Sequence, residues 1–363
     1  MKFNFSSPFN TLSFGFVGYN LAKEFLLTGE NEVAVYPTGR QTDLSAYSKA
    51  SPEFRAAFQQ SVERGLKVID RDAPEVKLWH IDGSENRLSN KSGLVTFYEL
   101  DSPTEQELAI LRSHERVFVT SKYTLDILTS FGLTNVSYVP LGFDKENFFD
   151  TKKSYYPPEV TVFGIFGKFE HRKRHAKAVK AWLSKFGKRR DVVLHTHLSN
   201  PHLSPEHHKG IYTELFGMEK PFNVNILPFM KTLGELNEAF NAVNIVLDMS
   251  GAEGFSLPSF HCLGLGKHGV IHNATAMKDW ANEKNSVLVN PARKIDSSDG
   301  FFFAKGRPFN QGNIFDWNED EFIAACETAL AKSRTNRLNQ EGLKLQDEFT
   351  WSRTSNTILE NLS

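Results

Sequence analysis

The 363-residue sequence contains only two cysteines, Cys262 and Cys326. Both lie in apolar, helix-like surroundings, which predicts buried thiols in a reducing compartment and disfavours a disulfide framework. No segment approaches the run of about 18 apolar residues that a membrane span needs, and the first ten residues, MKFNFSSPFN, lack the apolar core of a secretory signal. We therefore expect a cytoplasmic protein with no transmembrane segment.

An excess of charge of either sign is also absent. The chain has 42 Lys and Arg against 43 Asp and Glu, a net charge of −1, so no global attraction draws it to nucleic acid or anionic membrane. The motifs Gly-x-Ser-x-Gly, His-Glu-x-x-His and the Walker sequence are missing. Phenylalanine, by contrast, is abundant: 31 residues, many in polar surroundings, and the sequence offers no single reason for them.

The first part of the chain alternates short β-branched runs with helix-like segments, the pattern of a mainly parallel α/β sheet. We expect strands at 32–36, 66–69, 76–81, 93–98, 116–120 and 136–139. We expect helices at 19–28, 52–64, 104–113 and 122–131. A looser segment, 141–158, ends in Tyr-Tyr-Pro-Pro and predicts a domain boundary.

The same pattern then restarts. We expect strands at 160–166, 191–197, 223–227, 244–248, 269–272 and 286–289. We expect helices at 174–186, 204–216, 233–242, 257–266, 276–283, 319–332 and 336–349, and a last one after Trp351. Residues 292–318 are predicted to form one long loop, and loops of that length are usually functional or mobile. The chain is therefore predicted to fold as two Rossmann-like doubly wound domains, 1–150 and 151–349, with a ligand between the carboxyl ends of their strands.

The segment AEGFSLPSFHCLGLG, which begins at Ala252, follows the predicted strand 244–248. Ser256 is a good helix cap and Pro258 suits a first helical turn. Free backbone N–H groups and the positive end of the helix dipole favour an anion there. A carboxylate beside an anion is unfavourable, so Glu253 more plausibly faces hydroxyl groups. An anion next to a polyol indicates a sugar nucleotide.

The most basic segment, GKFEHRKRH at 167–175, follows the predicted strand 160–166. Cations at the carboxyl end of a strand can neutralise a leaving diphosphate, which is the main catalytic need of glycosyl transfer. We select Lys168, Arg172 and Lys173 for this role. From Lys185 onward the basic residues predict a solvated helix face, and a track for nucleic-acid phosphates stays the other interpretation.

Near the N-terminus, Gly15 and Gly18 lie in the sequence SFGFVGYN. This resembles a dinucleotide-binding fingerprint, but Leu12 stands at the position of the first glycine and no acid ends the next predicted strand. We favour a glycine loop that lets the backbone approach a diphosphate. A tight turn before a helix, or an NAD-dependent nucleotide-sugar epimerase or reductase, are the alternatives.

Three residues at predicted strand ends of the first domain are candidates for the acceptor and sugar side of the site: His80, Tyr98 and Glu99. The pair Asp70 and Asp72 follows the pattern by which some sugar transferases hold a divalent cation. Ala73-Pro74 directly after it favours a solvated turn instead, and we expect no metal site.

The run from Glu253 to Gly266 resembles the donor-binding motif of the retaining glycosyltransferases of the GT-B fold, closest to family 4. By this resemblance Glu253 contacts hydroxyls of the donor sugar, and the backbone amides of Gly254, Phe255, Ser256 and Leu257 meet the diphosphate. His261 stands where the family has a second Glu that usually holds the nucleotide ribose.

Other segments carry the same resemblance. Residues 167–173 are similar to the basic motif whose cations grip the diphosphate, and 119–144 resemble the passage to the linker. Tyr98-Glu99 stands where a His often ends the strand. Trp351 and the residues after it resemble a C-terminal segment that crosses back, so we expect a helix at 350–363 on the first domain.

The resemblance implies a metal-independent transfer, without a bound cofactor, from a nucleoside-diphosphate sugar to an acceptor hydroxyl with retained anomeric configuration. The acceptor is left open among a glycan, a small molecule, a protein and a hydroxymethylated DNA base. Besides the NAD-dependent enzyme, His261 and the basic helix leave a catalytically degenerate sugar- or nucleic-acid-binding protein as an alternative.

Overall fold

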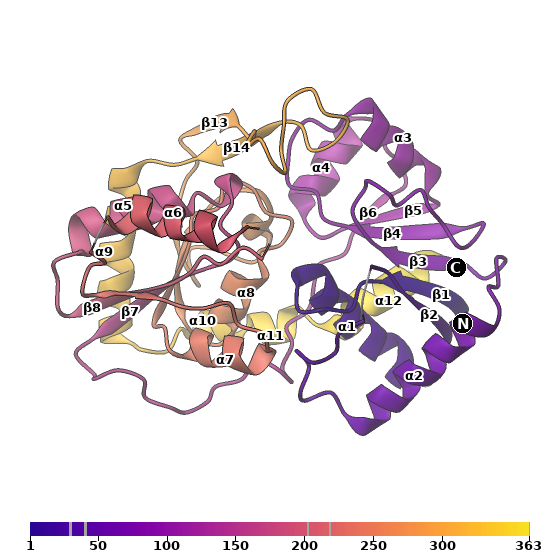
Figure 1. The fold of residues 1–363 in the computed structure, drawn as a ribbon, viewed down its shortest axis with the longest axis horizontal. Coiled ribbons are helices and arrows are strands. Elements are labelled where there is room, and N and C mark those ends of the chain that lie inside the picture. Colours follow the sequence, from indigo (N-terminus) through magenta and orange to yellow (C-terminus); the bar gives the residue numbers. More distant parts are fainter. Residues whose placement is uncertain (29–30, 40–41, 202, 218, 363) are drawn as a thin grey trace.

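The computed structural model describes the chain except for residues 29–30, 40–41, 202, 218 and 363. Its two halves each contain a six-stranded, all-parallel sheet with flanking helices (Figure 1). A two-stranded antiparallel hairpin accompanies the second sheet. The predicted α/β architecture of two facing Rossmann-like units is confirmed.

The first sheet has the strand order β2-β1-β3-β4-β5-β6. Its strands are β1 Lys2–Ser7, β2 Glu32–Pro37, β3 Glu75–Leu78, β4 Ser92–Thr96, β5 Arg116–Val119 and β6 Val136–Tyr138. Its helices are α1 Ser13–Leu27, α2 Pro52–Lys67, α3 Glu105–Ser113 and α4 Lys122–Ser130. The helix starts follow ordinary capping rules: a Thr104 capping box precedes α3, and the Ser121 hydroxyl caps α4.

Two expectations for the first sheet are wrong. The strand β1 is missing from the predicted set because its buried positions include polar residues, such as Asn4 and Ser6, whose partners lie about 70 residues away. The strand expected at 66–69 does not form, because α2 continues to Lys67. Leu66 and Val68 are 82% and 72% exposed, so their apolar character marks no sheet core.

The second sheet has the strand order β12-β11-β10-β7-β8-β9. Its strands are β7 Thr161–Phe166, β8 Val192–His197, β9 Val224–Ile226, β10 Ile245–Asp248, β11 His268–His272 and β12 Val287–Val289. Its helices are α5 His175–Phe186, α6 Pro205–Phe216, α7 Leu233–Asn241, α8 Leu257–Gly264 and α9 Glu319–Thr335, with 3-10 turns η1 His171–Lys173 and η2 Thr275–Asp279. The helix expected at 276–283 is thus only the turn η2.

The predicted long loop 292–318 begins and ends as a hairpin, β13 Arg293–Asp296 and β14 Asn313–Asp316. Its connection reaches α3 of the first half, at the top of Figure 1. There the Asp101 carboxylate accepts the Asn313 N–H at 2.8 Å and lies 2.7 Å from the Lys294 ammonium. The segment therefore joins the two halves.

The C-terminal residues also differ in detail from expectation. In place of one helix at 336–349 the structure has α10 Gln340–Leu343 and α11 Leu345–Glu348. The last helix, α12 Trp351–Leu362, packs against α1, β4 and β5 of the first half, and this confirms the predicted crossing of the C-terminal helix. The division of the chain into domains at 150 and 349 stays a prediction.

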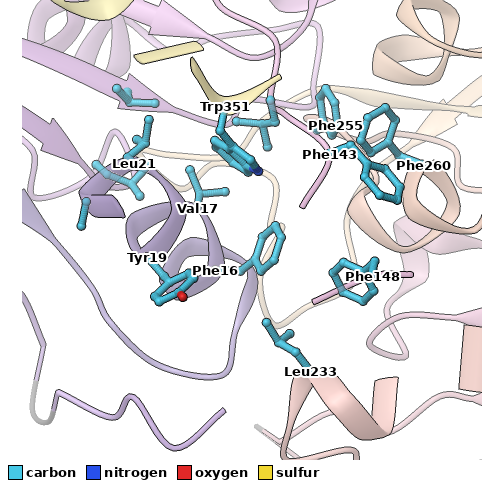
Figure 2. Packing of buried hydrophobic residues seen from close by; sticks show 14 of the residues in the cluster. Phe16, Val17, Tyr19, Leu21, Phe143, Phe148, Leu233, Phe255, Phe260 and Trp351 are labelled. Carbon is cyan, nitrogen blue, oxygen red and sulfur yellow. The ribbon is translucent and has the colours of Figure 1, made fainter. Parts of the chain in front are cut away.

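A cluster of aromatic rings fills the junction between the halves (Figure 2). We call it the aromatic seam, and its members are Phe16, Phe143, Phe148, Phe255, Phe260 and Trp351. The rings come from α1, the connection between the sheets, the turn before α8, α8 itself and the start of α12. The seam accounts for several of the phenylalanines that the sequence left unexplained.

The crossing of α12 over the connecting segment gives a testable prediction at Gly142. A Cβ there would lie 2.2 Å from the Trp351 backbone nitrogen and 2.6 Å from the Thr350 carbonyl carbon. Because both contacts are backbone, they cannot move aside cheaply, and Gly142→Ala should lower the free energy of unfolding by about 1–3 kcal/mol. Urea denaturation measures the change. Gly210→Ala, with nothing within 4 Å, is the matched control; equal stability of both variants would refute the close crossing.

Candidate active site

The candidate site forms where β7 and β10 end. These strands are parallel neighbours in the middle of the second sheet, so the segments after them, 167–174 and 249–256, lie side by side. Gly167 (φ 133°) turns the chain as it leaves β7, and Arg174 (φ 53°) begins α5 from the left-handed region. Each segment thus bends sharply beside the other.

Main-chain and side-chain hydrogen bonds of Arg172 hold the turn η1 against the turn after β10. The Arg172 carbonyl accepts the Gly251 N–H at 2.7 Å, and the Arg172 guanidinium donates to the Ala252 carbonyl at 2.7 Å. On the other side, Thr120 of the first half donates its hydroxyl to the Gly254 carbonyl at 2.7 Å. The position of the turn is therefore fixed from both halves of the chain.

The Glu253 carboxylate, on a side chain only 5% exposed, lies between two cations. It is 3.1 Å from Nη1 of Arg172 and accepts a hydrogen bond from Nζ of Lys173. Burial alone would raise the pKa of Glu253, but the charges of Lys173 and Arg172 outweigh burial and lower the pKa to about 2. Glu253 is therefore ionised, and the structure brings three of the predicted site residues together.

Two further carboxylates complete the group. Glu170 lies 3.1 Å from both Lys168 Nζ and Arg172 Nε, and Glu99, from the first half, lies 3.5 Å from Arg172 Nη2. Burial raises the pKa of Glu99. We call Lys168, Arg172, Lys173, Glu99, Glu170 and Glu253 the ion cluster; its three cations and three carboxylates balance.

Glu170 is the member of the ion cluster that the sequence analysis missed. It lies inside the basic segment, two residues after Lys168 and two before Arg172. The only sequence signal for Glu170 is that it is an acid within a run of basic residues. The sequence analysis considered only the basic residues of this segment. Its position makes the cations less available to an anion than the basic sequence suggests.

The start of α8 differs from the prediction at Ser256. Its backbone is left-handed (φ 67°), and its hydroxyl donates to the Asp248 carboxylate and caps no helix N–H. The expected side-chain cap is therefore wrong. The Phe255 side chain is buried in the aromatic seam and Gly254 packs on Phe97, so these residues offer a ligand their backbone groups.

His261 is placed differently from the expectation that it contacts the donor. Its side chain is 1% exposed, its Nδ1–H donates to the Leu257 carbonyl at 2.8 Å, and its Nε2 accepts the Asp144 N–H at 3.4 Å. Its ring packs against Phe16 and Phe148 of the aromatic seam. Burial lowers the pKa of His261 to about 3. Both ring nitrogens are engaged inside the protein, so the expected contact of His261 with the donor is wrong.

Gly15 and Gly18 lie within α1, which begins at Ser13, so the predicted glycine loop is wrong. A Cβ on Gly15 would lie 2.3 Å from the Asn10 carbonyl oxygen, and one on Gly18 would lie 2.1 Å from the Ser7 hydroxyl. The two glycines therefore serve to pack α1 closely on the residues before it.

Of the three acceptor-side candidates, the structure exposes one and brings another to the cations. His80 is exposed, with its ring 4.3 Å from that of Phe14; the surrounding protein and then the charge of Lys168 lower its pKa. Glu99 joins the ion cluster. Tyr98, however, is a core residue at 3% exposure, so its expected place at the rim is wrong.

Asp70 and Asp72, the pair weighed above as a possible cation site, lie in a surface turn. Asp70 accepts the N–H groups of Asp72 and Ala73 and lies 2.8 Å from Lys2, which makes it part of a surface turn. Over the described residues, no cluster of three or more His, Cys, Asp or Glu is arranged to hold a metal ion. No helix in that part of the chain is both long and apolar enough to cross a membrane.

The lowered pKa of Glu253 predicts a pH effect on stability. Its ordinary pKa is 4.5 and its folded pKa is about 2, so the ionised form stabilises the fold above pH 4.5, by up to roughly 3 kcal/mol, and this stabilisation is lost as the pH falls toward 2. Glu253→Gln should therefore lose less stability than the unmodified protein between pH 6 and 3.5 in urea titrations. Glu214→Gln, which changes a largely exposed carboxylate, is the control; an unchanged acid slope in Glu253→Gln would contradict the pairing.

Comparison of the sequence with protein-family profiles and with curated proteins gave no match. Solved structures do match over nearly the whole chain. Sucrose-phosphate synthase from Thermosynechococcus elongatus has 13% identity and a TM-score of 0.69, with 99% of this chain and 98% of that chain covered. Anabaena HepE in complex with UDP and glucose has 12% identity and a TM-score of 0.65, with 100% and 99% covered. Trehalose-6-phosphate synthase OtsA has 11% identity and a TM-score of 0.65 at the same coverage. These structural neighbours are GT-B glycosyltransferases, and the chain shares their two-domain fold.

Proposed function

We propose that the protein is a retaining, family-4-like glycosyltransferase that moves a hexosyl or pentosyl group from a nucleoside-diphosphate sugar to an acceptor hydroxyl. The observation that carries the proposal is the ion cluster, which places Arg172, Lys173 and Glu253 at the ends of β7 and β10, facing the first half. Solved structures of HepE contain UDP-glucose or UDP with glucose. A uridine nucleotide sugar is therefore the first donor to test.

The chemistry assigned to the cluster is charge stabilisation. As the bond from C1 to the phosphate oxygen breaks, Arg172 and Lys173 donate to the diphosphate and offset the charge that develops on it. The acceptor oxygen bonds to C1 on the same face, and its proton passes to the leaving phosphate oxygen. Glu253 accepts hydrogen bonds from hydroxyls of the donor sugar. The cations take the role that a metal ion has in other transferases, and the proposal includes no metal or bound cofactor.

The acceptor is proposed to be a glycan or a small molecule. The basic residues of α5 were the reason to consider modified DNA as an acceptor. Two of these cations form ion pairs with carboxylates: Lys180 with Glu214 at 2.9 Å, and Lys185 with Glu327 at 2.7 Å. Cations paired in this way give a weak phosphate track. A nucleic-acid acceptor therefore lacks the expected electrostatic support.

The alternative of an NAD-dependent epimerase or reductase rested on the spacing of Gly15 and Gly18. Both lie in a helix and pack against backbone or side-chain atoms, so they form no phosphate-binding loop.

We also propose a cytoplasmic location for the protein. The buried free thiols of Cys262 and Cys326 support it, because free cysteines are typical of a reducing compartment.

Donor binding should raise thermal stability. A ligand that binds only the folded state adds RT ln(1 + [L]/Kd), about 2.7 kcal/mol at 100 times Kd. We expect a rise in Tm with at least one of UDP-glucose, GDP-mannose and ADP-glucose, measured by differential scanning fluorimetry. NAD is included as the control for the rejected alternative. A response to NAD but to none of the nucleotide sugars would reverse the assignment.

Removal of one cation should reduce turnover. The assay measures release of nucleoside diphosphate from the nucleotide sugar that raises Tm, in buffer with EDTA. Lys173→Ala is expected to slow this release by roughly 10²–10³-fold, the usual cost of removing one hydrogen-bond donor from such a site. Lys173→Met removes the charge but keeps the apolar part of the side chain, so it preserves the packing. Circular dichroism checks that both variants are folded. Lys180→Ala removes an exposed cation from α5, the helix that follows η1, and should keep normal turnover. Normal turnover in well-folded Lys173→Met would exclude the mechanism.

A further inference from the structure

The turn that carries Glu253 receives two hydrogen bonds from the segment that follows β11. The Thr275 hydroxyl oxygen accepts the Glu253 N–H at 3.0 Å, and the Trp280 indole Nε1–H donates to the Phe255 carbonyl at 2.9 Å. Thr275 is the first residue of η2, and Trp280 follows the last one. We call residues 275–280 the η2 brace. The brace therefore binds the turn at Glu253 and again two residues later.

Thr275 has a backbone conformation that its side chain disfavours. Its φ is 43°, in the left-handed region, and the residue is only 2% exposed. A side chain branched at Cβ is rare there because it crowds the backbone, and such strain persists where the surrounding structure enforces it, often at functional sites. Glycine would adopt the same turn without strain. Of the groups that threonine adds over glycine, the hydroxyl is the one that binds the Glu253 N–H.

The Thr275 hydroxyl is oriented by a second contact. It donates weakly to the Met277 sulfur at 4.0 Å. With the proton directed there, the lone pairs of the oxygen stay available to the Glu253 N–H. Because a buried N–H without an acceptor is costly, loss of the hydroxyl favours a shift of the main chain at Glu253.

The other end of the η2 brace is fixed to the first half of the chain. One oxygen of Asp279 accepts the Lys122 N–H, at the start of α4, at 2.8 Å. Between the two ends, Ala276 and Met277 are fully buried, and Met277 belongs to the apolar cluster that contains the aromatic seam. Thr275 therefore lies on a segment that is itself held in place, as a residue that positions another must be.

The position of the Glu253 main chain decides how the carboxylate meets its two cations. The carboxylate lies 3.1 Å from Nη1 of Arg172 and accepts a hydrogen bond from Nζ of Lys173. Both cations are in η1, which binds the turn at Gly251 and Ala252, just before Glu253. The energy of a buried charge pair falls with distance and is little screened. A shift of Glu253 relative to η1 would therefore weaken both pairings.

We propose that Thr275 is a positioning residue, which holds the main chain at Glu253 so that the carboxylate lies between Arg172 and Lys173. Its effect on the reaction is exerted through Glu253. The catalytic part of this inference rests on the proposed function, in which Glu253 binds hydroxyls of the donor sugar. The structural part, the support of the ion pairing, is independent of that function.

The kinetic test compares two variants without the hydroxyl with one that keeps it. Thr275→Val retains the shape of the side chain, and Thr275→Gly suits the left-handed backbone. Both should lower kcat/KM for nucleoside-diphosphate release by roughly tenfold or more, mainly through a higher KM for the nucleotide sugar, because a small misplacement of a binding group is costly. Thr275→Ser keeps the hydroxyl and should retain nearly normal kinetics.

Thr354→Val is the matched control for the loss of a buried hydroxyl. Thr354 is also 2% exposed, and its hydroxyl donates to the Pro140 carbonyl at 2.7 Å, from α12. We expect this change to lower stability and to leave kcat/KM unchanged. Circular dichroism checks the fold of each variant, and Thr275→Gly decides the test if Thr275→Val does not fold.

Urea titration between pH 6 and 3.5 gives a second readout that needs no donor. Weaker pairing lets the pKa of Glu253 rise from about 2 toward 4.5, so less stability is lost on acidification. We expect a reduced acid slope in Thr275→Val and Thr275→Gly, as in Glu253→Gln, and an unchanged slope in Thr275→Ser and Thr354→Val. The charged and titratable groups around Glu253 are the same in all the threonine variants: Arg172 and Lys173 from η1, Glu99 from the first half and His175 from α5.

Three results would overturn the proposal: normal kcat/KM in folded Thr275→Val or Thr275→Gly, an unchanged acid slope in these variants, or no recovery in Thr275→Ser. A loss of stability with normal kinetics and a normal acid slope would make Thr275 a structural residue only. If the unmodified protein releases no diphosphate from any nucleotide sugar, the proposed function fails, and the acid slope alone decides the role of Thr275.

Discussion

Burial of the Glu253 carboxylate is the constraint on which the site depends. An ionised carboxylate removed from water costs several kcal/mol unless nearby cations and hydrogen bonds offset the loss of hydration. Arg172 and Lys173 supply that compensation from η1, 80 residues earlier in the chain. The turn after β10 can therefore be buried only if the segment after β7 folds over it, and both segments become one unit.

The balance of charge in the ion cluster has a consequence for an incoming anion. Three carboxylates already occupy the three cations, so a diphosphate gains full interaction only where a carboxylate yields its place. Glu99 is the member most easily displaced: it lies 3.5 Å from Arg172, it comes from the other half of the chain, and burial already raises its pKa. Glu253 and Glu170 each lie closer to two cations. An anion that displaced Glu99 would therefore compete with a contact between the halves at a single guanidinium group.

Local sequence patterns predicted most helices and strands of the second half, because its strands are short apolar runs and its helices have ordinary caps and periodicity. Glu253, Arg172 and Lys173 could be found for a similar reason, since each follows a predicted strand directly. The failures share a different cause. β1 contains Asn4 and Ser6, whose burial is explained only by distant partners, and Gly15 and Gly18 have the sequence of a loop but the environment of a helix. A local sequence pattern does not show which residue will contact a distant segment of the chain.

The placement of His261 shows how the halves are held around the ion cluster. The His261 ring packs with Phe16 of the first half, with Phe143 and Phe148 of the connection between the sheets, and with Phe260 of α8. Close-packed apolar surfaces of this kind resist separation. Strand β14 contacts the first half elsewhere, where the Asn313 main-chain and side-chain N–H groups donate to the Asp101 carboxylate. His261 is thus part of the packing between the halves that keeps Glu99 close to Arg172.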